Sequence, residues 1–301
     1  MGAEMSVDVL VAEFRSWLAV DRGLSRESVR CYGTQAGKFL AGLPGPVDAA
    51  VRQLDSGRIT TFMVDYCRDC NTWSAKAMVT SLRALLRFLH VSGRIPAPLV
   101  GAVPGVAGWR LASLPRGLDA PVVARLLDGC DRATVVGRRD RAILTMLARL
   151  GLRGVEAAGL ELDDIDWRSG EVTIRGKGNR IDRLPLPVDV GEAIVAYLTD
   201  GRPACAVATV FCTIRRPYRP LNAAAVRAIM GRACAHAGMA RVGAHRLRHS
   251  LASDMLRAGA SLPEVGQVLR HRSDLSTAIY AKVDENALRP LAQPWPIQVR
   301  S

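Results

Sequence analysis

The sequence predicts a mainly α-helical protein with a small β-hairpin or sheet, divided into two domains. Three observations indicate this fold class. Apolar residues recur at helical spacing through most of the chain, a central stretch alternates with period two, and a segment rich in proline and glycine separates two patterned regions. A length of 301 residues and an apolar content of 49% suit about two domains that each build a core.

The first predicted domain covers residues 1–100 and consists of helices. We expect helices over residues 7–20, 25–40, 58–70 and 74–91. The last of these has the clearest buried stripe, because apolar residues recur there at helical spacing: Val79, Leu82, Leu86 and Leu89.

A second face of the helix predicted over residues 74–91 carries positive charge. Lys76, Arg83 and Arg87 share this face, at relative positions i, i+7 and i+11. Such a face can lie along DNA phosphates, and it can equally be a solvated helix face. We therefore treat these three residues as candidate DNA-binding residues.

A linker is predicted over residues 101–117, and the second domain over 118–301. In this domain a helix ends near Gly151, and two strands, 171–175 and 180–186, flank a glycine-rich turn. The chain is then expected to be helical to about residue 288. The C-terminal tail, 284–301, contains three prolines and is expected to be irregular.

The charge balance points to a polyanionic partner. The formal net charge is +13, which is typical of proteins that bind DNA or RNA. Arginine outnumbers lysine by 37 to 4, so part of this charge can reflect a codon preference for arginine.

The seven cysteines form no disulfide framework, and Cys67 and Cys70 lack the two further ligands of a zinc site. With no signal peptide or membrane-length apolar run, we expect a reduced, cytoplasmic protein that holds no metal.

Two short motifs carry candidate catalytic cations. Arg153 follows a predicted helix end, in the motif 151–156, from which it can project into a cleft. Lys177 lies on the predicted hairpin tip, where the surrounding glycines allow the backbone to approach a ligand closely. Unlike arginine, a lysine can give up a proton when its pKa is lowered, which makes Lys177 a candidate acid.

Two further motifs combine histidine, arginine and tyrosine. His245 and Arg248 are three residues apart on a predicted helix and share a face, so a proton-exchanging group lies beside a phosphate-binding group. His271 follows, and Tyr280 comes nine residues later. Three of the five histidines fall between residues 245 and 271, which argues against a merely charged helix surface.

Together these residues resemble the tyrosine recombinase, or phage integrase, family. That family's active site contains Arg, Lys, His-x-x-Arg, His or Trp, and Tyr, in the chain order found here: Arg153, Lys177, His245, Arg248, His271 and Tyr280. The motifs cover about residues 118–290, and the helical N-terminal region is similar to the family's core-binding domain. The resemblance implies a DNA-binding helical domain followed by a mixed α/β catalytic domain of the tyrosine recombinase type.

The sequence departs from the family pattern at two positions. Arg270 stands where the family usually has glycine, and Arg246 stands where it often has aspartate. Both changes add positive charge beside the expected site, and neither replaces a catalytic group.

The resemblance implies a site-specific DNA recombinase that uses no cofactor. Tyr280 would attack a phosphodiester and form a 3′-phosphotyrosine bond, with Arg153, Arg248 and His271 on the phosphate oxygens. His245 would accept the tyrosine proton, and Lys177 would protonate the leaving 5′ oxygen. The covalent bond conserves the phosphodiester energy, so religation needs neither ATP nor metal.

The implied partners are double-stranded DNA and other copies of the same chain. The family resemblance implies a tetramer on DNA in which the C-terminal tail packs on a neighbouring protomer through its apolar residues: Leu288, Leu291, Trp295 and Ile297. These residues could equally fold back on their own domain. Accessory DNA-bending or directionality proteins are compatible with the sequence, and a membrane partner is not expected.

Two alternative functions stay open. A type IB topoisomerase uses similar groups, but the separate helical N-terminal domain and the His-x-x-Arg-His motif favour a recombinase. A non-catalytic DNA-binding protein descended from recombinases is the other alternative. It would have no need for Tyr280 or Lys177, so the complete set of six residues argues against it.

Overall fold

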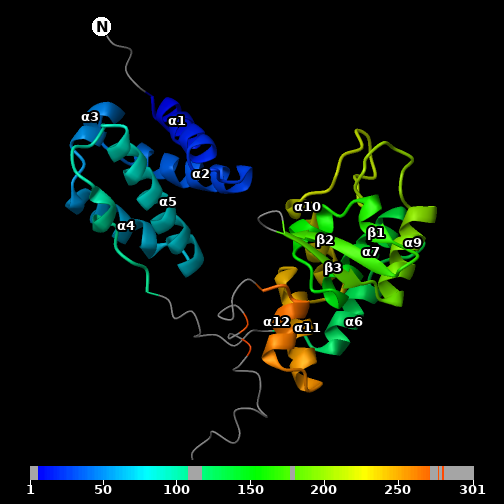
Figure 1. The fold of residues 1–301 in the computed structure, drawn as a ribbon. Helices are drawn as coiled ribbons and strands as arrows, with labels where there is room; N and C mark the ends of the chain where they lie inside the picture. Colours follow the sequence, from blue (N-terminus) through cyan, green and yellow to red (C-terminus); the bar gives the residue numbers. More distant parts are fainter. Residues whose placement is uncertain (1–5, 108–116, 177–179, 272–276, 278–279, 281–301) are drawn as a thin grey trace, which may run out of the picture. The chain divides into compact units, whose positions relative to one another are not determined.

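The computed structural model describes residues 6–107, 117–176 and 180–271, together with Thr277 and Tyr280. These residues form two compact units, one drawn from residues 1–110 and the other from residues 111–301 (Figure 1).

The N-terminal unit is a bundle of helices. Side chains at the residues preceding four of them accept a hydrogen bond from the first helical turn, which fixes where each helix begins: Ser6, Ser25, Asp55 and Asn71. The unit consists of α1 (Val7–Val20), α2 (Arg26–Ala41), α3 (Val47–Arg52), α4 (Ser56–Arg68), α5 (Thr72–Val91) and the short 3-10 helix η1 (Leu99–Ala102).

The core of this unit forms where α5 packs against α2 and η1. Phe14 and Phe88 contact each other there, with ring centroids 5.6 Å apart. The predicted stripe of α5 is buried in this core. Ile95 and Val103, which flank η1, are each only 2% exposed and belong to the same core. The N-terminal unit thus extends into the stretch whose prolines and glycines indicate a linker.

The C-terminal unit combines helices with a small sheet. Its elements are α6 (Ala120–Asp128), α7 (Val135–Arg149), α8 (Gly154–Ala158), η2 (Leu162–Asp164), β1 (Ile165–Asp166), β2 (Glu171–Gly176), β3 (Arg180–Pro185), α9 (Val188–Asp200), α10 (Ala223–His236), α11 (His245–Arg257) and α12 (Leu262–Val268).

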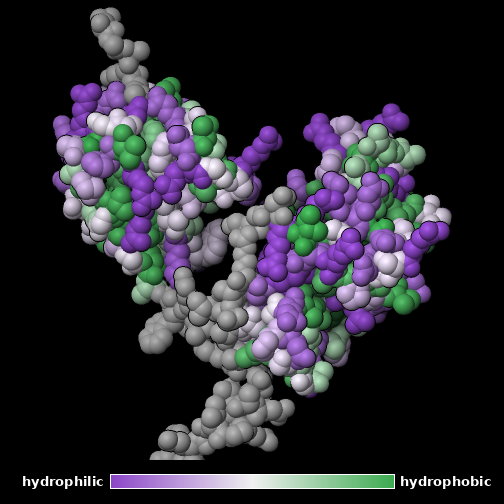
Figure 2. Space-filling model, viewed as in Figure 1, coloured by the Kyte–Doolittle hydropathy of each residue, from purple (hydrophilic) through white to green (hydrophobic). Residues whose placement is uncertain are grey.

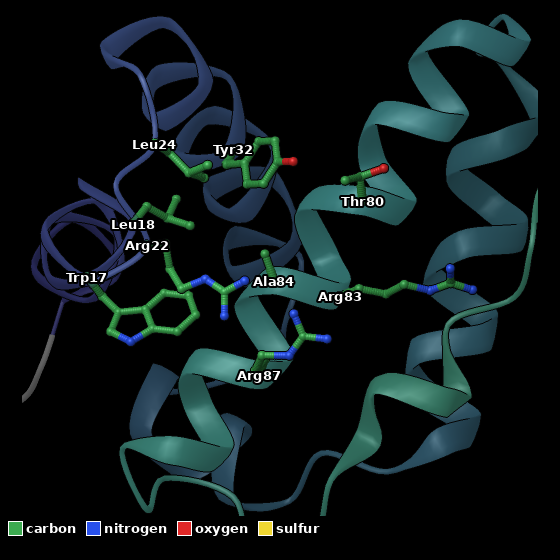
Figure 3. A pocket seen from close by; sticks show the side chains of 9 residues that line it. All are labelled: Trp17, Leu18, Arg22, Leu24, Tyr32, Thr80, Arg83, Ala84 and Arg87. Carbon is green, nitrogen blue, oxygen red and sulfur yellow. The ribbon is translucent and has the colours of Figure 1, made fainter. Parts of the chain in front are cut away.

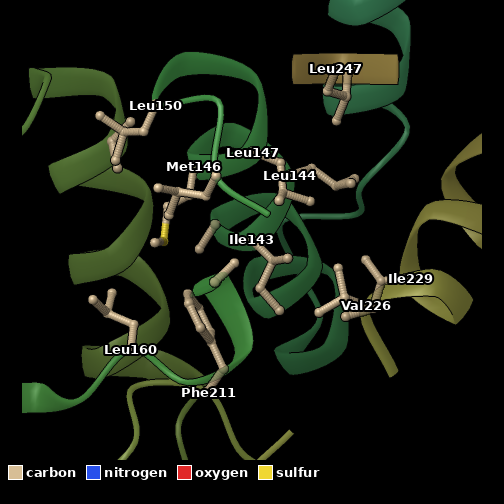
Figure 4. Packing of buried hydrophobic residues seen from close by; sticks show 14 of the residues in the cluster. Ile143, Leu144, Met146, Leu147, Leu150, Leu160, Phe211, Val226, Ile229 and Leu247 are labelled. Carbon is tan, nitrogen blue, oxygen red and sulfur yellow. The ribbon is translucent and has the colours of Figure 1, made fainter. Parts of the chain in front are cut away.

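Helix α7 lies at the centre of this unit. Ile143, Leu144, Met146 and Leu147 are completely buried, and residues from α10, α11 and the chain around Phe211 pack around them (Figure 4). Helix α9 packs along α7. Because α7 is buried on several sides, its C-terminal end and the turn that follows are held in a fixed place.

The sheet is antiparallel, in the order β1–β2–β3. Strands β2 and β3 pair from Glu171 with Pro185 to Gly176 with Arg180, as the predicted hairpin requires. Strand β1 is two residues long, too short to leave an alternating pattern in the sequence. The prediction of continuous helix after the hairpin is wrong for residues 201–222. All of these residues are described, and they form loops joined by bridges such as Cys212 with Pro220.

The visible surface of both units is mainly hydrophilic, with hydrophobic side chains scattered among the polar ones (Figure 2). Among the helices that the structure describes, none combines the length and the apolar character needed to cross a membrane.

Candidate active site

Arg153 is placed by the sharp turn that ends α7. Gly151 has a φ of +57°, and a side chain there would come within 2.7 Å of the Leu269 side chain, so only glycine suits this position. Arg153 then forms the N-cap of α8. Its side chain is 42% exposed, which leaves the guanidinium accessible to a ligand.

Glu156 holds Arg153 in this position. Its carboxylate accepts the backbone N–H of Arg153 at 2.8 Å and the Arg153 guanidinium at 2.7 Å. The same carboxylate accepts a hydrogen bond from Arg270 at 2.9 Å. Burial alone would raise the pKa of Glu156. The hydrogen bonds from Arg153 and the positive charges of Arg270 and Arg153 outweigh burial, so this pKa is lowered and the carboxylate stays ionised.

Arg248 lies on the first turns of α11 and is only 1% exposed. Its Nη1 donates to the carbonyl oxygen of Gly151 at 2.5 Å, and its Nη2 donates to that of Leu269. Burial, followed by the charges of Arg153 and Arg270, lowers the pKa of Arg248 to about 10, so the guanidinium is still charged at neutral pH. Arg248 therefore joins the turn after α7 to the end of α12 and brings a positive charge into the interior.

Tyr280 is also only 1% exposed. Its hydroxyl oxygen lies 2.6 Å from Nδ1 of His249. Burial raises the pKa of Tyr280 to about 12, although the charge of Arg248 opposes the shift. Burial, together with the charges of His245, Arg246 and Arg248, lowers the pKa of His249 to about 4. The contact therefore joins a neutral imidazole to a protonated phenol at neutral pH.

His271 and His245 flank this contact. The His271 ring lies parallel to the Tyr280 ring, with a centroid distance of 6.1 Å, and its Nδ1 is 2.7 Å from Oγ1 of the buried Thr277. Burial and the nearby arginines lower the pKa of His271 to about 4. His245 meets the His249 ring edge to face, with centroids 4.6 Å apart.

The structure brings together five of the six predicted catalytic residues: Arg153, His245, Arg248, His271 and Tyr280. Lys177, the sixth, lies outside the described residues. Its neighbour Gly176 ends strand β2 beside the site, because a Cβ atom built on Gly176 would be 4.0 Å from Oε1 of Glu156.

Two residues that contact the candidate site, Glu156 and His249, were not among the predicted site residues. Glu156 stands three positions after Arg153, the spacing of a side chain that reaches back to its helix N-cap. His249 stands four positions after His245 and therefore shares its helix face. Both spacings are evident in the sequence, but neither indicates that His249 meets Tyr280.

The three candidate DNA-binding residues of the N-terminal unit, Lys76, Arg83 and Arg87, are all exposed on α5. Arg83 and Arg87 line a pocket together with Arg22 (Figure 3). In this pocket Arg22 lies over the Trp17 ring, 5.6 Å from its centroid. Arg83 extends away from Trp17 and donates to the Val103 carbonyl at 3.0 Å. Lys76 does not line the pocket.

Several named proteins are similar to this chain in sequence. The Sinorhizobium fredii protein named integrase/recombinase y4rA is 42% identical over 97% of this chain and 72% of its own length. The tyrosine recombinase XerC of Azotobacter vinelandii is 33% identical over 77% of each chain. The tyrosine recombinase XerD of Corynebacterium glutamicum is 28% identical over 95% of this chain and 97% of its own length.

Solved structures share the fold. The recombinase XerH bound to a palindromic difH substrate aligns with a TM-score of 0.73 and 20% identity, over 96% of this chain and 85% of its own. A lambda integrase dimer bound to a core site aligns with a TM-score of 0.69 and 18% identity, over 90% and 97%. Residues 116–287, which contain all six predicted catalytic positions, match the model of the phage integrase family, and the chain belongs to that family.

Proposed function

We propose that this protein, a site-specific DNA recombinase, cleaves and rejoins DNA strands through a 3′-phosphotyrosine bond to Tyr280. One observation carries the proposal. The Tyr280 hydroxyl lies 2.6 Å from a neutral imidazole, that of His249, in a site that also contains Arg153 and Arg248. A protonated nucleophile, a proton acceptor and fixed positive charge are the groups that transfer of a phosphodiester to an enzyme hydroxyl needs.

The two arginines stabilise the negative charge that develops on the phosphate. Their own charge does not change during the reaction, so they act without reorganisation. Arg153 is accessible and can approach a non-bridging oxygen directly, whereas Arg248 is buried and supplies its charge from beneath the site. We assign to His271, whose ring lies beside that of Tyr280, a further hydrogen bond to the phosphate.

The proton of Tyr280 needs an acceptor because burial holds the pKa of Tyr280 at about 12. We assign this role to His249, the imidazole that contacts the hydroxyl, in place of His245. His245 lies against the His249 ring, where it can alter the pKa of His249 or take the proton on from it.

During cleavage the oxygen of Tyr280 bonds to phosphorus, the bond from phosphorus to the 5′ oxygen breaks, and the tyrosine proton passes to His249. The departing 5′ oxygen takes a proton from Lys177, its predicted donor.

Double-stranded DNA is the substrate that this chemistry and the net charge of +13 imply. We propose that Lys76, Arg83 and Arg87 contact its phosphates.

A structural relative is a lambda integrase tetramer bound to a Holliday junction. We propose a tetramer on DNA for this chain as well, with the apolar residues of the tail joining protomers. The cytoplasm is the compartment we assign to this function.

The strongest alternative is a DNA-binding protein that has kept the fold without the chemistry. The His249–Tyr280 contact argues against it, because binding alone does not need a paired nucleophile and acceptor. A type IB topoisomerase would use the same groups but would relax supercoiled DNA without a specific site.

A suicide-substrate assay tests the proposal. Nicked duplexes that carry candidate crossover sites, taken first from the DNA that flanks the gene, are incubated with the wild type and with Tyr280→Phe. We expect a covalent protein–DNA band with the wild type only. A band that persists in the variant would contradict the proposal. Relaxation of plasmids that lack the site would favour the topoisomerase.

A further inference from the structure

Arg270 occupies an unusual backbone position between α12 and His271. Its φ is +53°, and among the described residues it is the only non-glycine residue with a positive φ. This region disfavours side chains with a Cβ atom, so an arginine persists there only where other interactions hold it.

The Arg270 side chain is held by a buried ion pair. Its Nη2 donates to Oε2 of Glu156 at 2.9 Å, and both side chains are only 4% exposed. Its Nη1 lies 3.4 Å from the Val268 carbonyl oxygen. A guanidinium buried this deeply does not contact DNA directly, and its ion-pair partner Glu156 links it to the exposed Arg153.

That partner is the carboxylate that positions Arg153. Oε1 of Glu156 accepts the Arg153 guanidinium, while Oε2 accepts both the Arg153 backbone N–H and Arg270. Arg270 therefore fixes the carboxylate in the orientation that presents Oε1 to Arg153. It also changes the charge balance: Glu156 and Arg153 alone would form a neutral pair, whereas the three residues together carry one net positive charge.

We propose that Arg270 is a positioning residue for DNA cleavage, which acts through Glu156 to hold Arg153 in place and to preserve the positive charge that Arg153 presents to the scissile phosphate. This inference rests on the proposed function, because it assigns Arg153 to the phosphate. It differs from a purely structural role, in which the ion pair only fastens α12 to α8.

A double-mutant cycle separates the two roles. Arg270→Gly removes the side chain and also relieves the backbone, since glycine suits a φ of +53°. Glu156→Gln keeps an acceptor oxygen for Arg153 and removes the charge that Arg270 balances. The readouts are the single-turnover rate of covalent complex formation with saturating enzyme on a nicked duplex, the Kd for DNA, and the melting temperature.

We expect Arg270→Gly to lower the cleavage rate by about 10- to 100-fold, the range in which loss of positioning acts, with little change in Kd. In the Glu156→Gln background, the same change should have an effect of less than about threefold, because no unbalanced carboxylate remains. Arg270→Lys should recover part of the rate.

Arg232→Met is the matched control. Arg232 also donates to a buried carboxylate of the same unit, that of Asp140 at 2.6 Å. Its loss should lower the melting temperature and leave the cleavage rate of the folded protein unchanged.

A wild-type cleavage rate in Arg270→Gly, or equal effects of that change in both backgrounds, would overturn the inference and leave the proposed function intact. Absence of any covalent complex with the wild type would overturn the proposed function, and the inference with it.

Discussion

The candidate DNA-binding cations of the N-terminal unit differ in burial from two arginines at the candidate active site of the C-terminal unit. In the N-terminal unit, Lys76, Arg83 and Arg87 are exposed along one helix. In the C-terminal unit, Arg248 and Arg270 are buried and donate to backbone carbonyls or to a carboxylate. Exposed cations attract a polyanion, and salt screens this attraction. Buried cations are held in fixed positions, so they can stabilise the charge that develops in a transition state.

This contrast predicts two different kinds of defect. Substitutions in the catalytic cluster should slow bond cleavage and leave DNA affinity largely unchanged. Substitutions on α5 should weaken binding and leave the cleavage rate of the bound complex unchanged.

Among substitutions that leave the nucleophile in place, the largest effect is expected for Arg153→Gln. Loss of one charged donor to a transition-state oxygen typically costs about 10²- to 10³-fold in rate. Because the Arg153 side chain is 42% exposed, folding should be little affected. Single-turnover cleavage and thermal melting check this prediction. If a loss of DNA affinity accounted for the whole defect, Arg153 would act in DNA binding and not in cleavage, and the difference expected between the two units would be wrong.

A smaller loss is expected for His249→Gln. Removal of a general base typically costs about 10²- to 10⁴-fold, and we expect the low end of this range because a pKa of about 4 makes His249 a weak base. His245→Gln, made in parallel, should have the smaller effect, because His249 and not His245 contacts the Tyr280 hydroxyl. Cleavage rates of the two variants decide between them, and a larger loss for His245→Gln would restore the role that the family resemblance implies for His245.

Stability should depend on pH through the buried histidines. The folded-state pKa of His249 and of His271 is lowered from 6.5 to about 4, so the unfolded chain binds more protons between these values. The free energy of unfolding should therefore fall as the pH drops from about 6.5 towards 4, by up to about 3 kcal/mol for each histidine. Above pH 6.5 these two groups should cause no change.

Urea unfolding at several pH values checks this dependence. In His249→Gln the slope between pH 4 and 6.5 should be shallower than in the wild type. An unchanged slope would show that His249 titrates normally in the folded protein.

The smallest effect is expected on α5. Arg87→Ala should weaken DNA binding a few-fold and lower the slope of log Kd against log salt concentration by about 0.9, the value for one phosphate contact on duplex DNA. Arg30→Ala is the control, because this exposed arginine of the same unit is already paired with Glu27 at 2.5 Å. Equal salt slopes for both variants would show that α5 makes no specific contact with phosphate.

Sequence reasoning predicted the local elements well where a pattern was repeated. The helix expected over residues 7–20 is α1, and the hairpin strands pair as expected. It failed for residues 201–222, where Pro203, Pro217 and Pro220 interrupt the helical pattern. It also missed β1, which has only two residues.

The chemical groups of the site were predictable because their order along the chain resembles a known family. Their contacts were not predictable, because they join residues far apart in the sequence. His249 meets Tyr280 across 31 positions, and Arg270 meets Glu156 across 114. Arg270 was recognised as a departure from the family pattern, but only the fold shows that its charge is buried against the residue that holds Arg153.

Identification of the residue that becomes attached to DNA decides whether Tyr280 is the nucleophile. The covalent complex formed on a nicked duplex is digested with nuclease and protease, and the modified peptide is sequenced by mass spectrometry. We expect a nucleotide joined through its 3′ phosphate to the oxygen of Tyr280 alone. The same modification on any other residue, or a covalent complex that forms with Tyr280→Phe, would contradict it.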